Sequence, residues 1–208
     1  MHYLNDPDAI YARSFAIIAE EVDLSGVPAS LRPVALRLIH ACGMTDILPD
    51  LRITEDMVAA VSAALAFGRP LLADCEMLKS AIIARNLPPA TEIICTLNHT
   101  QAAERGRRLG ITRSGAAVAL WEPHLEGAVA CIGNAPTALF ALMEMIDAGG
   151  PKPAAIIAFP VGFVGAAEAK AELASNPRGI PFATLLGRRG GSAMAAAAIN
   201  AIFAGRPT

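Results

Sequence analysis

Five short apolar runs in the second part of the chain constrain the fold more than any other feature. They occupy residues 70–73, 91–97, 128–132, 154–159 and 182–186. Each run is followed by a turn and then by a segment with apolar residues at helical spacing. Buried parallel strands read as continuous apolar runs because helices cover both faces of their sheet. The sequence therefore predicts an α/β fold with a mostly parallel sheet of about five strands, flanked by helices.

The part of the chain before these runs has a helical pattern. Residues 8–21, 31–41 and 54–67 each carry apolar side chains three and four positions apart, which predicts an N-terminal helical segment. Thr54, followed by two acidic residues, is a suitable start for the third helix, and Gly68 is a suitable stop. The composition is even along the chain, so we expect residues 1–208 to form a single α/β domain.

The composition indicates a globular protein and argues against some partners. Apolar residues make up 54% of the chain and charged residues 17%, whereas aromatic residues make up only 5%, so Ala, Val, Ile and Leu must form the core. The net charge of -2 and the absence of a basic tail in the sequence argue against a nucleic acid partner. The sequence has neither a signal-peptide pattern nor a long uninterrupted apolar run, so we expect no membrane partner.

The four cysteines predict neither disulfides nor a metal site. They are widely separated, form no CxxC pair and have no histidine at the spacing of a zinc site: Cys42, Cys75, Cys95 and Cys131. We interpret them as reduced core residues, which predicts a cytoplasmic protein without a bound metal.

Three turns at expected strand ends suit an anionic ligand. They cover residues 133–136, 162–165 and 187–192, and each precedes a helical segment whose free N–H groups favour negative charge. Parallel strands place these turns at one edge of the sheet, where open α/β folds bind ligands. Arg188 and Arg189 lie in the third turn. Each turn alone is ordinary turn chemistry, but together they favour a polyanion.

The known nucleotide and nucleophile motifs are missing from the sequence. It contains no G-x-G-x-x-G after a strand, no phosphate-binding P-loop, no G-x-S-x-G elbow and no H-E-x-x-H. We therefore expect no cofactor. What remains is Arg37 and His40 on one face of an apolar helix, one turn apart. A solvated helix face explains this pair as well as acid–base chemistry on a polycarboxylate does.

Five segments in order carry a resemblance to the precorrin-8X methylmutase family of cobalamin biosynthesis. They are IYARSF at 10–15, RLIHACG at 37–43, TRS at 112–114, GNAPTAL at 133–139 and PVGFVGAAE at 160–168. The resemblance runs from about residue 8 to the last helix. It implies an isomerase that moves a methyl group of a corrinoid precursor from ring carbon eleven to carbon twelve, giving hydrogenobyrinic acid. An intramolecular shift of this kind needs no cofactor.

The resemblance also assigns roles to residues. It implies that His40 is the catalytic acid and that Arg37 and Ser14 hold the substrate. Arg113 begins an expected helix over residues 114–124, where it suits bidentate binding of a substrate carboxylate, while Ser114 suits the cap of that helix. Family members are homodimers, and the small residues at 193–199 are compatible with a subunit interface or with packing on the chain's own sheet.

Three alternatives remain open from the sequence alone. A cobalt-precorrin-8 methylmutase would carry its metal in the substrate and need no protein ligand for it. A corrinoid carrier would use the same anion sites without turnover. A nucleotide-dependent α/β enzyme is disfavoured because no acidic ribose partner follows the glycine turns.

Overall fold

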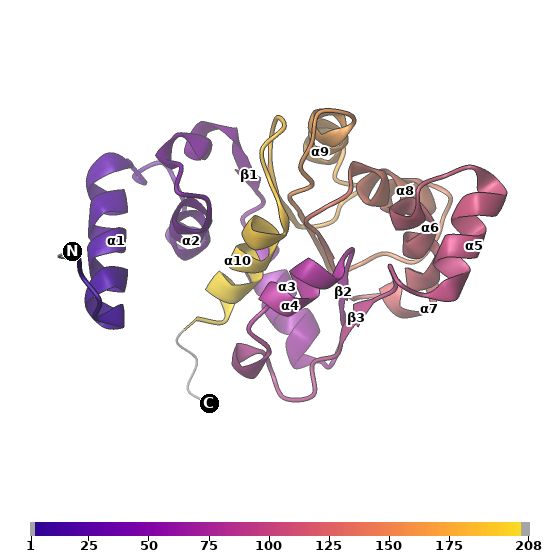
Figure 1. Ribbon diagram of the computed structural model, residues 1–208, viewed down its shortest axis with the longest axis horizontal. Helices are drawn as coiled ribbons and strands as arrows, with labels where there is room; N and C mark the ends of the chain where they lie inside the picture. The colour runs from indigo at the N-terminus through magenta and orange to yellow at the C-terminus, as the bar shows by residue number, and fades with distance from the viewer. Residues whose placement is uncertain (1–2, 205–208) are drawn as a thin grey trace.

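The computed structural model describes residues 3–204 and contains a six-stranded sheet with helices on both faces (Figure 1). The strand order is β1-β6-β5-β4-β2-β3, and every neighbouring pair except β1 with β6 is parallel. The strands are β1 (Leu51–Ile53), β2 (Leu71–Ala73), β3 (Ile93–Cys95), β4 (Val129–Ile132), β5 (Ala155–Ala158) and β6 (Phe182–Leu185). The α/β class and the mostly parallel sheet are confirmed, and all five expected strands are present.

The sixth strand, β1, was not expected from the sequence. It has only three residues, with the charged Arg52 in the middle, so it lacks the apolar run that marked the other strands. It pairs antiparallel with β6 at the edge of the sheet, with Leu51 opposite Leu185. An edge strand needs one neighbour only, which explains why such a short and partly polar segment is sufficient.

Two layers of helices bury the two faces of the sheet. In β4, Val129 and Cys131 belong to one apolar cluster, and Ala130 and Ile132 to the other. The first layer contains α2 (Arg32–Cys42), α3 (Met57–Ala66), α4 (Glu76–Ala81) and α10 (Ser192–Ile202). The second contains α6 (Arg113–Val118), α7 (Glu122–Leu125), α8 (Pro136–Asp147) and α9 (Ala166–Ser175), with α5 (Thr100–Leu109) packed on α6. This double cover explains the continuous apolar strands.

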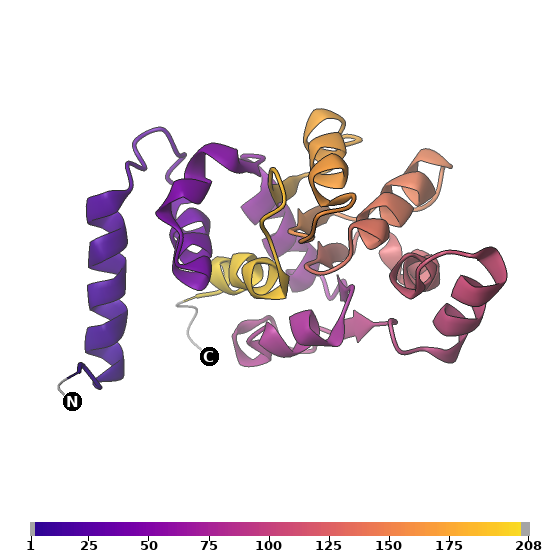
Figure 2. The ribbon, with the colours of Figure 1, turned by 45° about the horizontal axis from the view of Figure 1, so that its top comes forward.

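The first helix, α1 (Pro7–Glu21), lies outside both layers. It packs on α2 at one end of the molecule, and Figures 1 and 2 show it standing apart from the sheet. Asp6 caps its start by accepting a hydrogen bond from the N–H of Ala9 at 2.7 Å. Only Ile18 of this helix is buried, whereas Ile10, Tyr11 and Ile17 are exposed. A large part of the apolar surface of α1 therefore has no cover from the residues that the structure describes.

Two of the expected helices have different limits in the structure. The third helix starts at Met57 and not at Thr54, because Thr54 continues the pairing of β1 by exchanging hydrogen bonds with Phe182. The helix expected over residues 114–124 is divided into α6, the 3₁₀ turn η3 (Ala119–Trp121) and α7. Two further 3₁₀ turns are η1 (Thr45–Asp50) and η2 (Ala84–Asn86).

The small residues at 193–199 form no exposed interface. They belong to α10, which is buried along most of its length and packs against α2 and α4 of its own chain. Small side chains let these helices approach closely, so intramolecular packing explains the pattern. Within residues 3–204 no helix is long and apolar enough to cross a membrane.

Candidate active site

His40 lies in the last turn of α2, where side chains of α1 surround its ring. Its Nδ1 is 2.8 Å from the hydroxyl oxygen of Ser14. Phe15 stacks on the imidazole at a centroid distance of 5.1 Å, and Tyr11 lies 5.3 Å away at a tilted angle. The ring is therefore fixed at Nδ1 and on its face, and no group within residues 3–204 hydrogen-bonds its Nε2.

Arg37 shares this face of α2, one turn before His40. Its guanidinium lies over the ring of Tyr11 at 5.2 Å, a cation–π contact. The side chain is half-buried, and burial lowers the pKa of Arg37 from its usual value. Two potential cations thus lie together near the helix C-terminus, where the partial negative charge of the helix end accommodates them.

The local sequence places this pair at the end of the helix. Pro33 in the first turn favours helix initiation, and Gly43 ends α2 with a φ of 68° directly after Cys42. On α1, Tyr11, Ser14 and Phe15 are three and four residues apart and so point to the same side. Tyr11 and Ser14 therefore share one face of α1, and it is the face that meets α2.

Arg113 and Ser114 begin α6, far from His40 along the chain. Thr112, and not Ser114 as expected, caps this helix by accepting a hydrogen bond from the N–H of Gly115 at 3.1 Å. Thr112 also donates its hydroxyl hydrogen to Thr137 at 2.7 Å, which ties the start of α6 to the start of α8. With the cap position taken, Ser114 is the second residue of the helix and directly follows the exposed Arg113.

One chain does not bring the two groups of predicted site residues together. Ser14 contacts His40 directly, and the ring of Tyr11 contacts both His40 and Arg37. Figures 1 and 2 both show α1 and α2 at one end of the molecule and α5 and α6 at the other. No hydrogen bond or ion pair recorded for residues 3–204 joins Arg113 or Ser114 to the His40 group.

Asp74 is a buried residue that the sequence reasoning missed. Its carboxylate accepts hydrogen bonds from the N–H groups of Gly133, Asn134 and Ala135 at 2.9, 3.0 and 2.9 Å. Burial raises the pKa of Asp74, and the three N–H donors oppose that rise. The available signal was an acidic residue directly after an apolar strand. Asp74 thus fixes the turn before α8.

Hydrogen bonds join the second turn of this edge to the first turn and to the third. The N–H of Val161 donates to the carbonyl of Asn134 at 3.4 Å, and that of Gly162 to the carbonyl of Arg188 at 3.2 Å. The side chain of Arg189 pairs with Asp46 at 2.8 Å and with Asp50 at 3.2 Å. The expectation that both arginines of the third turn serve a ligand is therefore weakened, because Arg189 already has carboxylate partners.

Comparison with known proteins identifies the family. The precorrin-8X methylmutase family model matches residues 9–204. The chain belongs to the precorrin-8X methylmutase family. It is 54% identical over 200 residues to a precorrin-8X methylmutase of Pseudomonas aeruginosa, covering 96% of each chain. It is also 33% identical to a cobalt-precorrin-8 methylmutase of Priestia megaterium, covering 94% of this chain and 87% of that protein.

A solved structure agrees with this assignment. The precorrin-8X methylmutase of Thermus thermophilus superimposes with a TM-score of 0.84 at 34% identity, covering 94% of both chains. Membership of the precorrin-8X methylmutase family makes this chain an isomerase of cobalamin biosynthesis. The family predicted from the five sequence segments is confirmed.

The thiols and acids of this methylmutase form no metal site in the part that the structure describes. Among residues 3–204 no group of three or more His, Cys, Asp or Glu side chains is placed to hold an ion. The four cysteines are free. Burial raises the pKa of Cys75 and Cys131, and it raises that of Cys95 to about 11, so these thiols stay protonated at neutral pH.

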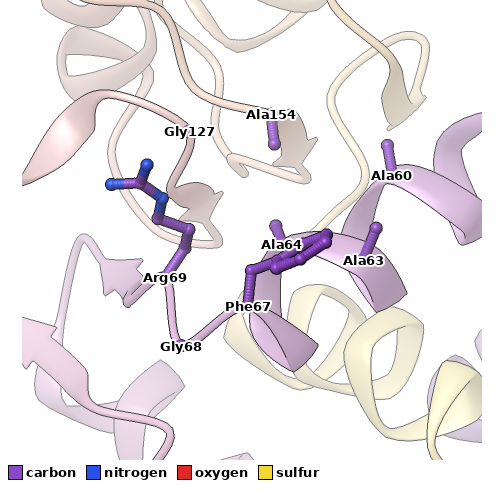
Figure 3. Close-up of a pocket in the computed structure, with 8 residues that line it drawn as sticks. All are labelled: Ala60, Ala63, Ala64, Phe67, Gly68, Arg69, Gly127 and Ala154. Carbon is purple, nitrogen blue, oxygen red and sulfur yellow. The ribbon is translucent and has the colours of Figure 1, made fainter.

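A hollow of about 550 Å³ lies at the opposite edge of the methylmutase sheet, where the strands begin (Figure 3). Its lining is formed mainly by small residues of α3 and by the segments before β2, β4 and β5. Phe67 and Arg69 lie at its rim. None of the predicted site residues lines it: Ser14, Arg37, His40, Arg113 and Ser114 lie elsewhere.

Proposed function

We propose that His40 is the acid of the methyl shift. Its imidazolium donates a proton from Nε2 to the conjugated macrocycle of precorrin-8X or to a ring nitrogen. The methyl group then migrates with its bonding electrons from carbon eleven to carbon twelve, and the proton returns to His40. Substrate and product are isomers, so the step balances without a redox partner. The observation that carries this proposal is the His40 ring, fixed at Nδ1 with Nε2 left for the substrate.

We propose a positioning role for Ser14 in place of the direct substrate contact that the resemblance implied. When His40 is protonated, its Nδ1–H donates to the Ser14 hydroxyl oxygen. After Nε2 has given up its proton, the neutral ring keeps its hydrogen on Nδ1, which still donates to the Ser14 hydroxyl oxygen, and Nε2 is left as the acceptor to which the proton returns. The same contact therefore supports both protonation states of the acid. Arg37 binds a carboxylate arm of the substrate in this proposal, as do Arg113 and Ser114.

The substrate is proposed to be the metal-free corrinoid. The support is the higher identity to the relative named precorrin-8X methylmutase, 54%, than to the one named cobalt-precorrin-8 methylmutase, 33%. Conversion of the cobalt form at an equal or higher kcat/KM would assign this chain to the cobalt branch instead.

We propose a homodimer whose two copies complete each site. The exposed apolar face of α1 needs a cover, and α1 with its flanks carries Asp6, Asp8, Glu20 and Glu21 against one arginine. At the other end of the molecule, α5 carries three arginines, Arg105, Arg107 and Arg108, against Glu104; it ends at the exposed Leu109, and the exposed Ile111 lies two residues further. Charge and apolar surface are therefore complementary between α1 of one copy and α5 of the other. This docking would bring Arg113 of the second copy to His40.

Mixing two single variants tests the shared site. His40→Asn and Arg113→Ala are each expected to lose most activity alone, but a mixed dimer contains one site with both native residues. We expect activity to return after subunit exchange, up to about a quarter of wild type on statistical grounds. No return of activity between two variants that remain dimeric by sedimentation would contradict the shared site.

Turnover of precorrin-8X tests the function itself. Wild-type protein and His40→Asn are mixed in parallel with metal-free precorrin-8X while the visible spectrum is followed. We expect conversion by wild type and a loss of about 10²–10⁴ in rate for His40→Asn. His124→Asn, at an exposed histidine outside the site, is the control and should retain full activity. Binding without conversion by wild type would indicate a corrinoid carrier.

We also propose that the protein acts in the cytoplasm. The support is the four free cysteines, which a reducing compartment keeps as thiols. Fractionation of cells with an antibody to the chain tests the location, and recovery outside the cytoplasmic fraction would contradict it.

A further inference from the structure

The carboxyl edge of the sheet exposes an apolar tip beside an arginine. Phe163 and Val164 are 84% and 89% exposed, and Val161 is also exposed. The guanidinium of Arg188 lies over the Phe163 ring at 5.3 Å from its centroid. Phe163 lies in one of the segments that carry the family resemblance, but the resemblance assigns no role to Phe163 or Arg188, and the His40 proposal uses neither. An aromatic ring and two valine side chains in water are costly unless they cover a ligand.

The turn that carries Phe163 is held in place on both sides. Gly165 has a φ of 79°, and its backbone lies so close to Pro136 and Phe140 of α8 that a side chain would only just fit. At the other side, the N–H of Gly162 donates to the carbonyl of Arg188. The exposed tip is therefore a fixed surface, which reduces the entropy cost of binding a ligand there.

The turn that carries Arg188 is fixed as well. The buried Lys170 donates a hydrogen bond from Nζ to the carbonyl of Arg189 at 2.5 Å. The Arg189 side chain is held by Asp46 and Asp50. Arg188 itself has no carboxylate partner recorded within residues 3–204, so its charge is available to an incoming anion.

The pair also lies on the same edge as Arg113. The turn with Phe163 contacts Pro136 and Asn134 at the start of α8. The next residue of α8, Thr137, accepts the hydrogen bond from Thr112 that fixes the start of α6. Phe163 therefore lies on the same edge as a ligand bound at Arg113 and Ser114. We call these residues, together with Arg188, the rim.

We propose that Phe163 and Arg188 form a further substrate contact, in which the ring lies against the corrinoid macrocycle and the guanidinium binds a carboxylate arm. This inference rests on the proposed function, since it needs a flat apolar ligand with acidic arms. An aromatic ring offers a face to the macrocycle, and arginine offers a fork of donors to the carboxylate. The charge of Arg188 favours this occupant over a plain apolar protein surface.

The hollow of Figure 3 offers a matched control within the same chain. Phe67 is 85% exposed, as much as Phe163, and Arg69 lies two residues away. This second pair is at the opposite edge of the sheet, away from every residue of the rim. An exposed phenylalanine beside an arginine is thus present at both edges, but only one edge continues into the proposed site.

The test compares four variants by binding of hydrogenobyrinic acid, followed through its visible spectrum. We expect Phe163→Ala and Arg188→Gln each to raise Kd and KM about tenfold while kcat changes less than twofold. Phe67→Ala and Arg69→Gln should leave Kd, KM and kcat at wild-type values. All four substitutions are at exposed positions, and melting curves check that each variant folds as wild type does.

Two results would overturn the inference. One is an unchanged Kd in both rim variants. The other is dissociation of a wild-type dimer by Phe163→Ala, seen by sedimentation, which would assign the tip to a subunit contact. The rim contact is tested by Kd and the proposed reaction by turnover. Tight binding of hydrogenobyrinic acid by a wild-type protein that does not convert precorrin-8X would therefore contradict the proposed reaction and leave the rim contact intact.

Discussion

The helix pair α1–α2 and the carboxyl edge of the sheet hold their functional side chains by different means. His40 is placed by one hydrogen bond and two aromatic contacts, all from a helix that is mostly exposed. The carboxyl edge is placed by a buried carboxylate with three N–H donors and by hydrogen bonds between turns. The position of the proposed acid is therefore set by a surface helix, whereas the position of the proposed binding rim is set by groups of the core.

The two regions should therefore respond differently to substitution. A change in the rim supports should reduce the stability of the fold, since their polar groups are buried and have no water to replace a lost partner. A change beside His40 should affect the reaction more than the fold, since solvent reaches α1. The following predictions test this contrast, from the largest expected effect to the smallest.

Removal of the Asp74 carboxylate should have the largest effect on stability. We expect Asp74→Ala to lower the free energy of unfolding by about 3–5 kcal/mol, because three N–H groups, of which that of Gly133 is buried, lose their acceptor. Urea denaturation measures the change. Asp56→Ala, at an exposed aspartate before α3, is the control and should differ from wild type by less than about 0.5 kcal/mol. Equal losses of unfolding free energy in Asp74→Ala and Asp56→Ala would contradict the proposal that Asp74 supports the rim.

The buried Lys170 should make stability depend on alkaline pH. Burial lowers the pKa of Lys170 from 10.5 to about 8 in the folded protein. Between these two values the unfolded chain binds the proton and the folded protein does not, so this group makes the free energy of unfolding rise with pH. The rise is about 1.4 kcal/mol per pH unit at most, or about 3 kcal/mol over the whole window.

The contribution of Lys170 is read as the difference between wild type and Lys170→Met. Both proteins contain the cysteines with raised pKa values, whose opposite effect at alkaline pH cancels in the difference. Urea denaturation at pH 7, 8, 9 and 10 gives the two curves. Parallel curves would show that the lysine is not desolvated in the folded protein.

Ser14→Ala should slow the reaction without unfolding the protein. We expect kcat to fall about tenfold with KM unchanged, because the imidazole loses its fixed orientation while the carboxylate-binding arginines remain. Ser80→Ala, at an exposed serine of α4, provides the comparison. A rise in KM with kcat unchanged would instead support the direct substrate contact implied by the family resemblance.

Thr112→Val should have the smallest effect on stability. It removes the cap of α6 and the hydrogen bond to Thr137, at a cost of about 1 kcal/mol. Because Arg113 and Ser114 follow directly, KM should also rise. Thr100→Val at the start of α5 is the matched control. A KM of Thr112→Val equal to that of wild type would show that the cap of α6 does not affect substrate binding.

The sequence predicted the strands with a clear local signal and missed the one without it. The run at 154–159 could be recognised alone, because each of its residues must be apolar to lie between two layers of helices. Arg52 of β1 faces no such requirement, and its strand exists because β6, about 130 positions away, offers a free edge. A partner so distant in the sequence leaves no periodic pattern in the short strand that it stabilises.

The same distinction applies to the site and explains what each level determined. By itself the sequence determined the family, the face shared by Arg37 and His40, and the face shared by Tyr11 and Ser14, because helical spacing is a local property. Only the tertiary structure decided that these two faces meet, that Thr112 displaces Ser114 from the cap, and that Asp74 holds the turn at Gly133. These contacts join residues whose geometry is set by packing between elements, and packing depends on the whole core at once.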